Sequence, residues 1–149
     1  MSSRLARFAA VHAALTASHE LADHWVQTDD DANDKGLDGA AGRAACLRHV
    51  ATYTATQAAA LLALRRLDPG LTPARITAAL TISAVTHYAA DRQGGRWRDP
   101  NPRGVARLAH TIGKSGWLTR DPHAPYLMDQ SWHKTWLGIA AAVAAAGRP

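Results

Sequence analysis

The sequence predicts an all-α protein: a single domain over residues 1–149, folded as a bundle of about five helices with a polar His/Asp cluster in its core. Alanine, the strongest helix former, supplies about a fifth of the chain. No stretch alternates apolar and polar residues with the period of a half-buried strand, and valine and isoleucine are sparse. A third observation, histidine and aspartate repeated at helical spacing, predicts what the core contains.

The first two expected helices are long. One runs from about residue 3 to residue 27 and ends before an expected loop at 29–38, which holds five aspartates. The next runs over 39–67, because Asp68-Pro69-Gly70 is a strong helix breaker.

A third helix is expected over 72–92, because Thr72 suits the N-cap and Pro73 suits the first helical position. The remaining chain is expected to hold a shorter helix over 103–112, a loop over 113–125 with two glycines and two prolines, and a last helix over 126–146.

One pattern occurs on three of these helices, as His19-x-x-x-Asp23, His87-x-x-x-Asp91 and the reversed Asp129-x-x-x-His133. Residues four apart lie above one another on one helix face, so each copy presents an imidazole and a carboxylate together. A single pair at this spacing is usually a hydrogen bond on a helix surface. Three pairs, with His49 on a fourth helix, favour a metal site built from facing helices.

The predicted metal ligands share this imidazole and carboxylate chemistry. They are His19, Asp23, His49, His87, Asp91, Asp129 and His133. The single cysteine, Cys46, excludes a thiolate cage and a disulfide within the chain. Nitrogen and oxygen ligands suit Zn, Mn or Fe without choosing among them. Their number suggests one or two ions, or carboxylates that orient the ligating imidazoles.

A divalent ion with an open coordination position lowers the pKa of bound water and supplies a nucleophile near neutral pH. The sequence therefore predicts a metal-dependent hydrolase, with Asp23 and Asp91 as catalytic residues, acting on a phosphoester or another small anionic substrate. The residues expected to bind the substrate or orient ligands carry a positive charge or an amide: Lys35, Arg92, Lys114, Gln27 and Gln130.

Positive charge is concentrated in residues 92–120, which hold seven basic residues and, apart from Asp99, no acid. The whole chain has a net charge of +5. An anionic partner is one interpretation, with nucleic acid as an alternative to a small substrate. No helix-turn-helix signature accompanies the segment, and an ordinary arginine-rich surface is the other interpretation.

The candidate membrane spans, 50–64 and 74–90, are shorter than the roughly 20 apolar residues that a span requires, and both contain polar residues. The apolar N-terminal stretch is short and interrupted by His12, which argues against a cleaved signal. The expected location is the cytoplasm, with peripheral membrane association left open.

Five parts of the chain carry a resemblance to a known family: His19–Gln27 (HELADHWVQ), Lys35, His49, Thr86–Arg92 (THYAADR) and Asp129–His133 (DQSWH). Together they resemble an uncharacterised family of small helical proteins of bacteria and phages, common in actinobacteria and mobile elements. That family is distantly similar to predicted membrane-bound metal-dependent hydrolases. The resemblance covers most of the chain and implies helices and a metal, without a substrate. The apolar segments here are more interrupted than in typical members.

Three functions are thus open at the level of sequence. The first is the metal-dependent hydrolase. The second is a non-enzymatic helical module that holds a metal or a small ligand with the same polar core. The third is a nucleic-acid-binding protein that uses the arginine-rich segment 92–120.

Overall fold

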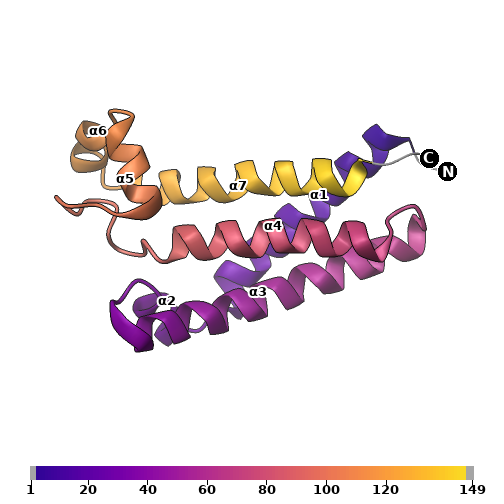
Figure 1. Ribbon diagram of the computed structural model, residues 1–149, viewed down its shortest axis with the longest axis horizontal. Coiled ribbons are helices and arrows are strands. Elements are labelled where there is room, and N and C mark those ends of the chain that lie inside the picture. Colours follow the sequence, from indigo (N-terminus) through magenta and orange to yellow (C-terminus); the bar gives the residue numbers. More distant parts are fainter. Residues whose placement is uncertain (1–2, 147–149) are drawn as a thin grey trace.

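The computed structural model describes residues 3–146, and all regular structure in that range is helical (Figure 1). The elements are α1 (Arg4–Leu21), η1 (Ala22–Val26), α2 (Asp29–Asp34), α3 (Gly39–Leu67), α4 (Pro73–Asp91), α5 (Gly104–Thr111), α6 (Ser115–Arg120) and α7 (Ala124–Ala145). The predicted all-α class is confirmed. The expected number of about five helices is wrong, because the described residues form seven α-helices and one π-helical turn.

The extra helices lie where loops were expected. In α2 the Thr28 hydroxyl accepts a hydrogen bond from the Asp31 N–H at 3.2 Å. Three aspartates in the first turn stabilise the helix through their interaction with the positive end of its dipole. In α6 the Leu118 side chain is buried against Trp97 and its neighbours, which anchors a helix of only six residues. Helices this short have no apolar periodicity from which to predict them.

The first predicted helix also ends differently. α1 stops at Leu21, and the chain continues as the π-helical turn η1, in which the Gln27 N–H donates to the Ala22 carbonyl five residues earlier, at 2.9 Å. Such turns are rare and often occur at functional sites. Here the turn carries Asp23.

Four helices, α1, α3, α4 and α7, form an antiparallel bundle (Figure 1). Each contacts two neighbours, in the order α1, α3, α4, α7 and back to α1. Because successive bundle helices alternate in direction, the C-terminal parts of α1 and α4 lie at the same end as the N-terminal parts of α3 and α7. The short helices α5 and α6 lie beyond this end, and α2 packs against α3.

The opposite half of the bundle is apolar. Its core comprises Val11, Leu15, Leu61, Leu71, Ile76, Ala79, Leu137, Ala140, Ala141 and Ala144. The expected short spans 50–64 and 74–90 lie in α3 and α4. Of the helices within residues 3–146, none combines the length and the apolar character needed to cross a membrane.

Truncation of this apolar core should be costly. Leu137 is 1% exposed, so Leu137→Ala is expected to lower the free energy of unfolding by about 2–5 kcal/mol through lost burial and a residual cavity. Leu67, which is 84% exposed at the end of α3, is the matched control, and Leu67→Ala should change the free energy of unfolding by less than about 0.5 kcal/mol. Urea unfolding of both variants measures the difference. Equal losses would contradict the assigned core.

Candidate metal centre

The bundle brings four histidines from four helices together at its polar end. His19 lies near the end of α1, His49 in the first half of α3, His87 near the end of α4 and His133 in the first half of α7. All four are buried, with 0–2% of each residue exposed. The alternating helix directions thus place these residues at one level, although they are far apart in sequence.

Four atoms in this cluster lie close together. The Nε2 atoms of His49 and His87 are 3.0 Å apart. Each is 3.2 Å from Oδ2 of Asp91. Oδ1 of Asp23 lies 3.5 Å from the His49 nitrogen and 3.6 Å from the His87 nitrogen. Two imidazole nitrogens and two carboxylate oxygens therefore converge from three elements, α3, α4 and η1.

These separations fit one cation. A tetrahedral ion with ligands at 2.0–2.1 Å keeps the ligands about 3.3–3.4 Å apart. The five measured separations, 3.0 to 3.6 Å, lie on either side of that value. His49, His87 and Asp91 could therefore hold a metal ion, and His19, Asp23 and His87 form an adjoining group that could do the same. Imidazole nitrogens and carboxylate oxygens suit Zn, Mn or Fe.

Two carboxylate oxygens of the cluster accept no hydrogen bond from the described residues, and a bound cation would supply the missing interaction. Oδ1 of Asp23 and Oδ2 of Asp91 are buried and accept no hydrogen bond in the described structure, and the Lys35 ammonium forms an ion pair with the second at 3.1 Å. A buried acceptor without a donor costs about 1–3 kcal/mol, and more when it is charged. Both oxygens point to the same place as the facing nitrogens of His49 and His87, so an ion there would satisfy them together.

A second group adjoins the first through the other oxygen of Asp91. Nε2 of His133 lies 3.7 Å from Oδ1 of Asp91 and 3.3 Å from Oδ2 of Asp129. His133 is buried, whereas the Asp129 side chain is 22% exposed. These three residues also could hold a metal ion.

His19 and Gln130 complete the cluster. Nε2 of His19 lies 3.1 Å from the amide oxygen of Gln130, and the Gln130 amide nitrogen in turn faces Asp129 at 3.5 Å. In that arrangement Nε2 carries the proton and donates it, so Nδ1 of a neutral His19 has a free lone pair. Nδ1 faces Oδ2 of Asp23 at 3.5 Å. All seven predicted ligands thus lie in one connected cluster, and Gln130 orients one of them.

The two central carboxylates stay ionised despite their burial. Burial raises the pKa of Asp91, but the facing imidazoles of His87 and His133 and the charge of Lys35 together hold that pKa well below its ordinary value. The same competition lowers the pKa of Asp23, where burial is opposed by His49, His87, His19 and His133.

The histidines respond to burial in two ways. Burial lowers the pKa of His19 and of His87, so both are neutral at pH 7, as a metal ligand must be. Burial also acts to lower the pKa of His133, but the facing carboxylates of Asp129 and Asp91 raise it to about 9. In the metal-free protein His133 is therefore protonated at pH 7, and the proton must leave before its Nε2 can bind a metal ion.

Lys35 lies at the edge of the cluster. Its Nζ is 3.1 Å from Oδ2 of Asp91, and its side chain is 16% exposed. The Arg92 guanidinium donates to the carbonyl oxygens of Lys35 and Leu37, which fixes the α2–α3 connection against the end of α4. A Cβ at Gly36 would collide with the Gly94 carbonyl, so the close approach of these segments requires glycine. Lys35 is thus held at the site, and Arg92 holds the backbone around it.

Two other predicted substrate residues lie apart from the ligand atoms. Lys114 is the exposed N-cap residue of α6, and among the described residues its side chain makes no hydrogen bond or ion pair. Gln27 ends η1, and its buried amide nitrogen has no hydrogen-bond partner in the described part of the chain. Within residues 3–146, neither side chain forms a hydrogen bond or ion pair with the seven ligands.

The basic segment 92–120 is partly engaged within the protein. Arg92 holds the carbonyls described above, Arg96 pairs with Asp38 at 3.0 Å, and Arg98 donates to the carbonyls of Leu118 and Asp121. Arg98 is exposed despite these bonds, and Arg103, Arg107, Lys114 and Arg120 are exposed as well.

A polar chain behind the histidines was not assigned to the site from sequence. The Tyr53 ring stacks on His87 with centroids 3.8 Å apart, its hydroxyl shares a hydrogen bond with Ser83 at 2.9 Å, and the Gln57 amide donates to that hydroxyl at 2.8 Å. The signal was present, because Tyr53 and Gln57 continue the His49 face at steps of four. Burial and the charge of Asp91 raise the pKa of the Cys46 thiol to about 12, so the thiol is protonated at neutral pH.

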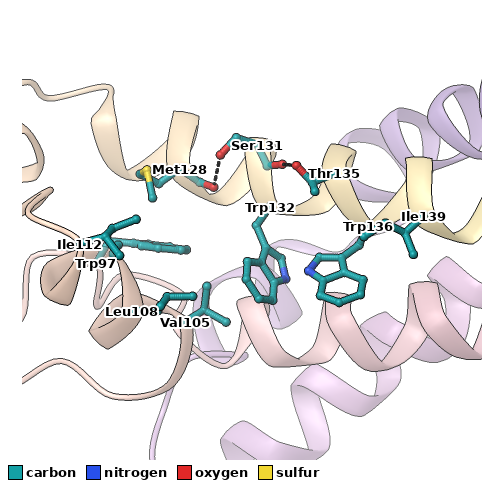
Figure 2. A pocket seen from close by; sticks show the side chains of 11 residues that line it. Trp97, Val105, Leu108, Ile112, Met128, Ser131, Trp132, Thr135, Trp136 and Ile139 are labelled. Carbon is teal, nitrogen blue, oxygen red and sulfur yellow. Dashed lines mark hydrogen bonds between the residues drawn. The ribbon is translucent and has the colours of Figure 1, made fainter.

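An apolar groove lies between α5 and α7 (Figure 2). Trp132 and Trp136 project into it, with Leu108 and Val105 opposite. Trp132 and His133 are adjacent in sequence, so their side chains point about 100° apart. The Trp132 indole N–H donates to the Thr86 carbonyl on α4 at 3.0 Å, so this ring helps to fix the α4–α7 pair.

Comparisons of the chain with protein-family models, with curated proteins and with solved structures find no match. The resemblance to small bacterial and phage proteins therefore stays a prediction from short motifs. What the centre can do follows from its own geometry.

The raised pKa of His133 predicts how the metal-free protein responds to pH. Because the folded-state pKa, about 9, exceeds the ordinary value of about 6.5, protonation of His133 stabilises the folded state below pH 6.5. That contribution should be lost as pH rises from about 6.5 to about 9. Urea unfolding in the presence of a chelator at both pH values measures the loss. His133→Gln should show a smaller loss over the same interval, and an equal one would contradict the assignment.

Proposed function

We propose that the chain is a metal-dependent hydrolase whose divalent ion is held by His49, His87, Asp23 and Asp91, and whose substrate is a phosphoester or another small anion. The observation that carries the proposal is that Oδ2 of Asp91 and Oδ1 of Asp23 lie 3.2 to 3.6 Å from two imidazole nitrogens that are themselves 3.0 Å apart, while neither oxygen accepts a hydrogen bond in the described structure. Zn, Mn and Fe all suit this donor set.

The accessible edge of the cluster supports hydrolysis of an anion. A divalent ion lowers the pKa of coordinated water and polarises an ester. The least buried groups around the proposed centre are Asp129 and Lys35, with side chains 22% and 16% exposed. Lys35 supplies a positive charge for a phosphoryl group, and Asp129 supplies a carboxylate that can accept a proton. Arg92 contributes by holding the Lys35 backbone.

The second candidate is a non-enzymatic module in which the ion holds the bundle together. Burial favours it, because His49, His87 and Asp91 are each 1% exposed. Four protein ligands also form a closed coordination shell, which is typical of a structural zinc ion, whereas a catalytic ion keeps an open position. Metal binding is common to both candidates, and only turnover distinguishes them.

Metal binding should depend on the four ligands. We expect the purified chain to bind Zn²⁺, and His49→Gln to lower the affinity by more than the roughly 10–100-fold typical of losing an outer-shell partner. His24→Gln is the matched control, because His24 is exposed on η1 and lies outside the cluster. Isothermal titration calorimetry on metal-free protein measures both. Equal affinities for the two variants would contradict the proposed ligands.

Binding should also stabilise the fold. At a free metal concentration of 100 times Kd, the free energy of unfolding should rise by about 2.7 kcal/mol, since the ligands are assembled only in the folded bundle. Chemical unfolding with and without Zn²⁺ tests this. Because the pKa of His87 is lowered by burial, protons should begin to compete with metal at this residue only below about pH 6.5. An unchanged stability at saturating metal would argue against an ion that connects α3, α4 and η1.

Hydrolysis should require the same ion. The metal-loaded protein is expected to release p-nitrophenol from p-nitrophenyl phosphate or its diester, and a chelator or His49→Gln should abolish release, while His24→Gln retains it. Turnover that survives His49→Gln would come from a contaminant. Metal binding without turnover of either ester would favour the non-enzymatic module.

A further inference from the structure

We propose that the centre binds two cations, with the second held by His133, Asp129 and the other oxygen of Asp91, and that this second cation faces the substrate. The inference rests on the proposed first metal site and adds a second site to it. Its starting point is the Asp91 carboxylate, which presents Oδ2 to His49 and His87 and Oδ1 to His133.

The second set has the spacing of a metal site. The His133 nitrogen is 3.3 Å from Asp129 Oδ2 and 3.7 Å from Asp91 Oδ1. In a tetrahedral arrangement these separations correspond to ligand distances of about 2.0–2.3 Å, the range of transition metals with nitrogen and oxygen ligands. An Asp91 carboxylate shared in this way fits two ions at the spacing of two-metal hydrolytic sites, about 3.5–4 Å.

An independent observation points to a ligand at this position. Nε2 of His133 belongs to a side chain that is 1% exposed, and no hydrogen-bond partner satisfies it within the described residues. It is directed at two carboxylates on different helices, α4 and α7. A metal ion between His133 and these carboxylates would bind the Nε2 lone pair together with Oδ1 of Asp91 and Oδ2 of Asp129.

The two sites differ in openness. The ligands proposed for the first ion, His49, His87, Asp23 and Asp91, would fill all four positions of a tetrahedral ion, and His49, His87 and Asp91 are each 1% exposed. His133, Asp129 and Asp91 supply only three ligands, and Asp129 is the most exposed of them. Three protein ligands with an open position are typical of a catalytic ion. The second site is therefore the one that a substrate can reach.

Charge balance favours an anionic substrate at the second site. With neutral imidazoles, Asp23, Asp91, Asp129 and Lys35 carry a net charge of −2. One divalent ion neutralises the cluster, and a second leaves it at +2 in a core of low dielectric constant. An anion such as a phosphoryl group restores neutrality, so the second ion creates the binding site for the substrate class proposed above.

The test is a Co²⁺ titration of the metal-free full-length chain, followed by d–d absorption and by elemental analysis after gel filtration. The wild-type chain should bind two equivalents. Asp129→Asn, a near-isosteric change at a partly exposed residue, should bind one equivalent and keep the absorption of the first, tetrahedral site. His24→Asn is the control and should bind two.

The outcomes separate the two proposals. One tight equivalent in the wild-type chain, with a tetrahedral spectrum, would overturn the second site and leave the first intact. No bound metal at all would overturn the proposed function itself. Two equivalents in Asp129→Asn would show that the second ion lies elsewhere. Mn²⁺ electron paramagnetic resonance adds a readout independent of folding yield, because a pair bridged by Asp91 should be magnetically coupled in the wild-type chain and uncoupled in Asp129→Asn.

Discussion

The burial of ionised carboxylates is the constraint on which the rest of this structure depends. Asp91 is 1% exposed and the Asp23 side chain 9% exposed, and an isolated carboxylate in such surroundings would take up a proton. Both nevertheless have lowered pKa values, because imidazoles from every helix of the bundle and the Lys35 ammonium face them. The polar end of the bundle is thus an arrangement of positive and proton-donating groups around two negative charges.

The apolar half of the bundle supplies the stability that offsets the cost of burying these charges. Leucine, isoleucine and alanine side chains from α1, α3, α4 and α7 form a continuous apolar core away from the histidines. That core can hold the helices together while several polar atoms at the other end lack hydrogen-bond partners. Two of these atoms, Oδ1 of Asp23 and Oδ2 of Asp91, face the same pair of imidazole nitrogens, which is the arrangement expected of a binding site whose ligand completes it.

The sequence predicts the parts of this protein that repeat at helical spacing. The i, i+4 pairs of His19, His87 and His133 indicate which residues share a face, and an antiparallel bundle then brings those faces to one level. The sequence could not predict α2 and α6, because their formation depends on the Thr28 cap and on burial of Leu118 rather than on periodicity. It also could not reveal that Arg92 binds backbone carbonyls, because that contact joins residues 55 and 57 positions apart.

The elements that the sequence predicts least well are those that set the chemistry of the centre. The π-helical turn carries Asp23 into the space between α3 and α4, and the connection from α2 to α3 brings Lys35 to Asp91. Helix faces alone would give a ring of imidazoles and carboxylates, symmetric about the bundle axis. Asp23 covers the side of the ring that holds His49 and His87. The side that holds Asp129 and Lys35 is more exposed to solvent. A regular bundle therefore supplies the ligands, and two local departures from regularity distinguish a closed side of the cluster from an accessible one.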